Sequence, residues 1–112
     1  DLAAECYRTA ISIDPGLSNA HNNLGTILLS QGKDGEARES YDAALRIEPD
    51  NADAQKNFGN ILLSQGDPAS AEAHFRRAVE LVPNWAAAHA DLGLALQRQD
   101  QDEAAREAFA AI

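Results

Sequence analysis

The sequence has no methionine, a single cysteine and a single tryptophan, and aromatic residues make up only 5% of its 112 residues. Cys6 has no second cysteine with which to form an internal disulfide, so we interpret it as a small apolar packing residue. Because the chain starts at Asp1 rather than at a methionine, we expect it to be part of a longer protein.

Basic residues and long apolar runs are also scarce. Nine lysines and arginines stand against 18 aspartates and glutamates, which leaves a net charge of -9. Polyanions bind where basic residues cluster, so we expect neither nucleic acid nor a membrane as a partner. No apolar stretch approaches the roughly 20 residues of a membrane span, and the first residues lack the pattern of a signal peptide. The expected location is therefore the cytoplasm.

The chain repeats itself every 34 residues. Leu24-Gly25 recurs as Phe58-Gly59 and as Leu92-Gly93, and the segment ILLSQG occupies both 27–32 and 61–66. Six residues repeated in register are not a chance event, so the chain is an array of repeats. A small and an aromatic residue recur at the same interval, as Ala3 and Tyr7, Ala37 and Tyr41, Ala71 and Phe75, and Ala105 and Phe109.

Every predicted element is a helix, because no run alternates with period two. Pro15, Pro49 and Pro83 mark helix ends, since proline lacks an N–H group and has a fixed φ. Asp67 before Pro68 is a favourable helix start, and Asp34 and Asp102 place negative charge at two others. The predicted helices cover residues 2–13, 18–31, 34–48, 52–65, 68–81, 86–99 and 102–112.

This pattern resembles the tetratricopeptide repeat family. The first full repeat carries the family's large, Leu-Gly, small, aromatic and proline positions as His21, Leu24, Gly25, Leu28, Ala37, Tyr41, Ala44 and Pro49. The resemblance implies an all-α, right-handed superhelical solenoid of antiparallel helix pairs. Its predicted units are an incomplete repeat at 1–17, which supplies only a second helix, repeats at 18–51 and 52–85, and a C-terminally truncated repeat at 86–112.

Glycines in the middle of the first helices indicate close packing. Gly25, Gly59 and Gly93 each cost roughly 0.5–1 kcal/mol relative to alanine in a helix, so a packing benefit should offset that cost. Because glycine has no Cβ, the paired helix can approach closely at these positions. We expect Ala37, Ala71 and Ala105 to be the matching small residues of the second helices.

Binding of a protein or peptide is the function that the resemblance implies, in a concave groove lined by the first helix of each repeat. Asparagine is a mediocre helix former, so a stripe of asparagines on one helical face suggests a functional role. Side-chain amides at repeat intervals could hold the backbone of an extended peptide, although solvated polar filler is the alternative. The predicted groove residues are Asn19, Asn22, Asn23, Thr26, Asp53, Lys56, Asn57, Asn60, Asp91 and Arg98.

Two further resemblances concern these inner residues. Asn23 and Asn57 are similar to the asparagines that precede Leu-Gly in the repeats of O-linked N-acetylglucosamine transferases, although Asp91 interrupts the series. This resemblance implies, as an alternative, a substrate-recognition segment of such a glycosyltransferase. Repeats of this family that grip a C-terminal carboxylate use basic inner residues, whereas Asp91 would repel that group, so we do not expect a ligand of this kind.

Catalytic, cofactor and metal sites are not expected. His21, His74 and His89 lie on different helices and too far apart to supply the three or four converging ligands that zinc needs. No phosphate-binding loop or nucleophile motif is present, so we expect a non-catalytic segment.

The two ends suggest a third hypothesis, in which the segment self-assembles into a scaffold. Terminal repeats of such arrays need polar caps. Apolar side chains at both ends are therefore predicted to support a homo-oligomer, namely Tyr7, Ile11, Phe109 and Ile112.

Overall fold

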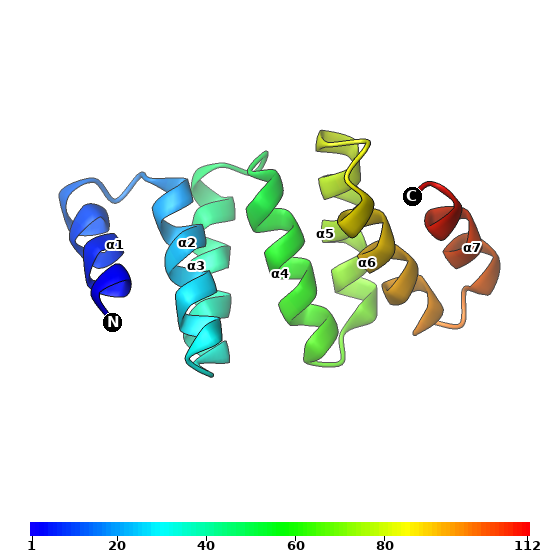
Figure 1. Ribbon diagram of the computed structural model, residues 1–112, viewed down its shortest axis with the longest axis horizontal. Helices are drawn as coiled ribbons and strands as arrows, with labels where there is room; N and C mark the ends of the chain where they lie inside the picture. The colour runs from blue at the N-terminus through cyan, green and yellow to red at the C-terminus, as the bar shows by residue number, and fades with distance from the viewer. The chain divides into compact units, whose positions relative to one another are not determined.

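A computed structural model describes residues 1–112, and all of its regular elements are helices. In chain order they are α1 (Leu2–Ile13), α2 (Ser18–Ser30), α3 (Asp34–Ile47), α4 (Ala52–Ser64), α5 (Pro68–Leu81), α6 (Ala86–Gln97) and α7 (Asp102–Ala110) (Figure 1). The all-α prediction is confirmed, and each helix begins where it was expected. The largest differences are at the ends of α6 and α7, which stop two residues early.

The chain divides into two compact units, Asp1–Asn57 and Phe58–Ile112. In the first unit α2 packs against both α1 and α3, and in the second α6 packs against both α5 and α7. Figure 1 shows α2 and α3 as an antiparallel pair joined by a short turn. Sequential helix packing is therefore confirmed in each unit.

The turn inside each helix pair uses a residue with positive φ. Gly32 and Gly66 adopt φ values of 75° and 83°, and Asp100 takes the same place with a φ of 59°. In each turn the next residue donates its N–H group to a carbonyl five residues back, for example from Lys33 to Leu28 at 2.9 Å. These bonds satisfy the last carbonyls of the first helix and reverse the chain direction.

Each second helix that precedes a proline ends in a hydrogen-bonded turn. The N–H groups of Leu17, Asn51 and Trp85 donate to the carbonyls of Asp14, Glu48 and Val82 at 3.3, 3.1 and 3.2 Å. The prolines occupy the second position of these turns, where a fixed φ is favourable. Asp67 precedes α5, the second helix of its pair. Its side chain accepts a hydrogen bond from the Ser70 N–H group, as expected for an N-cap.

The mid-helix glycines lie against aromatic rings of the paired helix. A Cβ added to Gly25 would lie 2.8 Å from Cε1 of Tyr41, and one added to Gly59 would lie 2.7 Å from Cε1 of Phe75. A Cβ on Gly93 would lie 2.5 Å from Cε1 of Phe109. Ala37, Ala71 and Ala105 are buried, but the ring four positions later is what fills the space beside each glycine.

One prediction about the core is wrong. Cys6 is exposed rather than packed, because it lies about 200° around α1 from the buried Ala4. The core of the first unit is built instead on Leu24, Leu28, Ala37, Tyr41 and Ala44, and that of the second on Ile61, Ala71, Phe75, Leu92 and Leu96.

Candidate protein-interaction surfaces

Two predicted groove residues, Asn22 and Asn57, are bonded to each other. Nδ2 of Asn57 donates to Oδ1 of Asn22 at 3.0 Å, and Asn22 is only 6% exposed. This bond joins α2 to α4 within the first unit. The amides of Asn22 and Asn57 are thus used inside the fold, which gives two members of the asparagine stripe a packing role.

A second polar network holds the start of α2 against α3 and α4. The Ser18 hydroxyl donates to the Ala44 carbonyl at 2.9 Å, and Nδ2 of Asn51 donates to the Ser18 oxygen at 2.8 Å and to Oδ1 of Asn19 at 3.0 Å. Oδ1 of Asn51 also accepts from the Ala54 N–H group, so Asn51 is the N-cap of α4. Sequence reasoning missed Asn51, although an asparagine directly before a predicted helix is the usual signal for a cap.

Thr26 links the predicted groove to the core. Its hydroxyl donates to the Asn22 carbonyl at 3.2 Å and lies 3.0 Å from the Tyr41 hydroxyl. Because the threonine proton is already used, Tyr41 is the donor in this second bond. Burial raises the pKa of Tyr41. Tyr41 therefore stays a neutral donor.

Three other predicted groove residues of the first unit differ in exposure. Asn23 and Asp53 are exposed, and Lys56 is half-buried. Asn23 is separated from Asn22 by about 100° around α2, so the two neighbouring asparagines have different surroundings. This unit therefore presents an amide, a carboxylate and an ammonium group beside the buried Asn22.

In the second unit, Asn60 and Asp91 are half-buried and Arg98 is exposed. A guanidinium nitrogen of Arg98 donates to the Leu63 carbonyl at 3.3 Å, near the C-terminal end of α4. A positive charge there also complements the helix dipole.

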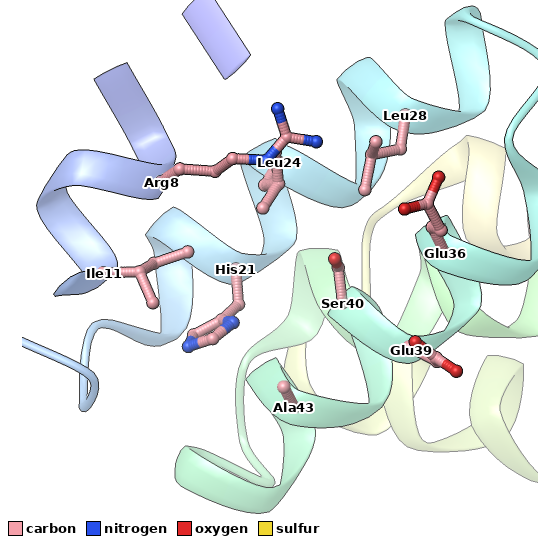
Figure 2. Close-up of a pocket in the computed structure, with 9 residues that line it drawn as sticks. All are labelled: Arg8, Ile11, His21, Leu24, Leu28, Glu36, Glu39, Ser40 and Ala43. Carbon is pink, nitrogen blue, oxygen red and sulfur yellow. The ribbon is translucent and has the colours of Figure 1, made fainter. Parts of the chain in front are cut away.

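In the first unit, the side of α2 away from the predicted groove residues carries a pocket that sequence reasoning did not predict. Its volume is about 330 Å³, and it lies among α1, α2 and α3 (Figure 2). We call it the α1–α3 pocket. Its lining comprises Arg8 and Ile11 from α1, His21, Leu24 and Leu28 from α2, and Glu36, Glu39, Ser40 and Ala43 from α3.

The side chains predicted to self-associate differ in exposure. Tyr7 and Ile11 are half-buried, and Ile11 lines the α1–α3 pocket. Phe109 is 36% exposed and Ile112 is 62% exposed. The most exposed large apolar residues of α1 are instead Leu2 and Ile13, at 81% and 80%.

Comparison with known proteins agrees with this helix pairing. The sequence profile described as Tetratricopeptide repeat matches residues 16–84, more than half of the chain. The chain belongs to the tetratricopeptide repeat family. Such repeats are generically protein-interaction modules and are typically non-catalytic. No curated protein matches the chain at the level of sequence.

Solved structures that share the fold of this tetratricopeptide repeat chain include two of MamA. The crystal structure of MamA protein is 19% identical with a TM-score of 0.87, and a second crystal structure of MamA is 22% identical with a TM-score of 0.88. The chain is covered to 96% in both cases, but it spans only 59% and 63% of those chains. At these identities the likeness shows the fold alone. Neither match bears on the resemblance to glycosyltransferase repeats.

The family's large-residue position has a specific structural role in this chain. Nε2 of His21 lies 3.2 Å from the Pro15 carbonyl, and Nε2 of His89 lies 2.8 Å from the Pro83 carbonyl. Gln55 donates in the same way to Pro49 at 2.8 Å. Each side chain thus ties the first helix of a repeat to the turn before it. For the histidines this requires the hydrogen to be on Nε2.

Other polar groups of these tetratricopeptide repeats form ordinary surface contacts. Arg46 pairs with Asp42 at 2.6 Å, and Arg76 pairs with Glu72 at 2.7 Å, each one helical turn apart. No three histidine, cysteine, aspartate or glutamate side chains converge as metal ligands would. None of the helices has the length and apolar character needed to cross a membrane.

Proposed function

We propose that this segment binds an extended peptide of a partner protein on the polar face of its first helices. The single observation that carries the proposal is the exposed amide of Asn23 beside the Asn22–Asn57 bond. The bond positions α2 against α4, while Asn23 remains available to a ligand. In the first unit the binding face also includes Asn19, Thr26, Asp53, Lys56 and Asn57.

The chemistry of this face suits a peptide backbone. A side-chain amide provides both a donor and an acceptor, which matches the alternating N–H and C=O groups of an extended strand. Asp53 and Lys56 add one charge of each sign, so they favour a ligand with mixed charge. In the second unit, Asn60, Asp91 and Arg98 supply the same classes of group.

The test is binding of the segment to a library of random peptides, before and after Asn23→Ala. We expect the substitution to weaken the best binders at least about tenfold, a loss of ~1.4 kcal/mol. Asn84→Ala is the matched control, because Asn84 is an exposed asparagine in the turn between α5 and α6. Unchanged binding by the Asn23 variant, with helicity retained, would show that the partner binds to another surface.

Self-association is a second candidate, favoured by the exposed apolar residues Leu2, Ile13 and Ile112. Each large apolar side chain that becomes covered contributes roughly 1.5–3 kcal/mol. Light scattering over a range of concentrations should then show a rising mass, and Ile13→Ser should reduce it. A constant mass would eliminate this candidate for the segment.

A role as the substrate-recognition part of a glycosyltransferase is a third possibility, supported by Asn23 and Asn57 alone. It requires a catalytic domain in the same polypeptide. The complete coding sequence tests this requirement directly.

A further inference from the structure

The α1–α3 pocket exists because the first repeat lacks two rings that the second repeat has. In the second repeat, the rings of Phe58 and His74 pack with their centroids 4.8 Å apart. The residues 34 positions earlier are Leu24 and Ser40, and both of them line the pocket. Two smaller side chains therefore leave open a space that rings occupy in the next repeat.

The floor of this pocket is apolar and firmly held. Leu24 and Leu28 are 8% and 3% exposed, so they belong to the core. The imidazole of His21 is kept in place by its contact with the Pro15 carbonyl. Ile11 completes the apolar wall from α1. A ring entering the pocket would meet a surface that is already formed.

The rim of the pocket is charged. Figure 2 shows Arg8 extending from α1 and Ser40 pointing from α3 toward Leu24, with Glu36 on the α3 side. Glu36, Glu39 and Arg8 are all exposed, so the rim carries two acidic groups against one basic group. The chain as a whole has a net charge of -9. A partner with a positive charge near its inserted residue is therefore electrostatically favoured.

We propose that the α1–α3 pocket is a docking site for an aromatic side chain of a partner protein that is adjoined by a basic residue. The aromatic ring packs on Leu24 and Leu28, where it takes the place that Phe58 and His74 share in the second repeat. The Arg8 guanidinium covers the ring from the α1 side, as cations commonly do over aromatic faces. Glu36 and Glu39 then pair with the basic residue.

The third repeat has only part of this arrangement. Its residues at the positions of Leu24 and Ser40 are Leu92 and Ala108, which are also small. However, Ala104 stands at the position of Glu36, so the pair of acidic groups is reduced to Glu107. The preference for a basic neighbour is accordingly assigned to the first repeat.

This site is separate from the polar face proposed above. Asn19, Asn23 and Thr26 lie on one side of α2, and Leu24 and Leu28 lie about 100–180° away at 3.6 residues per turn. The two proposals therefore succeed or fail separately.

The test uses blocked tetrapeptides in which the two central residues are Phe-Arg, Ala-Arg or Phe-Glu, added to the ¹⁵N-labelled segment and followed by NMR. The Phe-Arg peptide is expected to shift the amide signals of His21, Leu24, Leu28 and Ser40 in a saturable way. The Ala-Arg and Phe-Glu peptides should each bind at least about tenfold more weakly, because each lacks one of the two interactions.

A filled pocket is the matched control. The double variant Leu24→Phe and Ser40→His copies the second repeat. It should therefore keep its helices and bind the Phe-Arg peptide at least about tenfold more weakly. Glu36→Lys with Glu39→Lys changes only exposed positions, and it should reverse the preference between the Phe-Arg and Phe-Glu peptides. The proposal is overturned if no peptide saturates the pocket signals, if the ring or charge makes no difference, or if the folded filled variant binds equally well.

Discussion

Nδ2 of Asn57 donates to Oδ1 of Asn22 over 3.0 Å, and this bond is what allows a nearly buried amide to lie in the middle of α2. Asn57→Ala would leave the Asn22 oxygen without this donor. We expect a loss of about 1–3 kcal/mol in the free energy of unfolding, the usual cost of an unsatisfied buried group. Urea unfolding followed by circular dichroism measures it.

The neighbouring asparagine is the natural control for this prediction. Asn23 is exposed, so Asn23→Ala should change the free energy of unfolding by no more than about 0.5 kcal/mol. Equal effects of the two substitutions would show that the Asn22–Asn57 bond contributes nothing specific to stability.

Gly59→Ala tests the contact between glycine and ring. The new Cβ would lie 2.7 Å from Cε1 of Phe75, which is too close for a ring that is itself fully buried. We expect a net destabilisation of about 1–3 kcal/mol, although alanine is the better helix former. Adding Phe75→Leu should recover part of the loss.

Gly35→Ala should have the opposite effect on stability. Gly35 lies in the first turn of α3, and a Cβ there would meet nothing within 4 Å. Only the helix propensity remains, so we expect stabilisation of up to about 1 kcal/mol. If both glycine substitutions shifted stability in the same direction, packing against Phe75 would not explain the glycine.

The repeat spacing was sufficient to predict the helices and their pairing, because turn residues and helix periodicity are local signals. It could not separate Asn22 from Asn23. Both lie on the polar side of one helix, and only the position of α4 determines which of them is buried. The bonds of Asn51 to Ser18 and Asn19 could not be predicted for the same reason, although its place before a predicted helix was a local signal for a cap.

The α1–α3 pocket shows a different limit of sequence reasoning. The repeat that aligns Leu24 with Phe58 also aligns Ser40 with His74, so the difference in side-chain size was visible. That Phe58 and His74 touch, however, depends on the packing of α4 against α5. A cavity follows only when both substitutions face the same space.

Asp100→Gly should stabilise the chain. Asp100 has a φ of 59° at the turn position where the other two repeats have Gly32 and Gly66. A left-handed conformation costs a residue with a Cβ roughly 1–2 kcal/mol, and glycine avoids that cost. We expect a gain of about 1 kcal/mol in thermal or urea unfolding. The reverse exchange, Gly66→Asp, should lose a similar amount, and a gain in both variants would contradict the explanation.

His89→Gln should leave stability almost unchanged. Gln55 already makes the equivalent contact to a proline carbonyl at 2.8 Å, the same length as the His89 contact. His89→Leu keeps a side chain of similar bulk but removes the donor, so it should cost about 0.5–1.5 kcal/mol. Urea unfolding of the two variants separates loss of the hydrogen bond from loss of bulk, and a neutral leucine variant would remove the assigned role.

The contact of Glu72 with Gln99 predicts how stability depends on pH. A hydrogen bond from Arg76 is the largest cause that lowers the pKa of Glu72 from its ordinary value of 4.5, and Gln99 of the segment after α6 adds a second bond at 3.0 Å. A carboxyl group whose pKa is lowered by folding stabilises the fold when it is ionised. Its contribution is complete above about pH 4.5 and is lost as the pH falls through the lower folded pKa.

Glu72→Gln should therefore reduce the free energy of unfolding at pH 7, and the difference from wild type should shrink by pH 3. Glu39→Gln, at an exposed position beyond the first turn of α3, is the control. A difference for Glu72→Gln that stays constant with pH would show that its ionisation is not linked to folding.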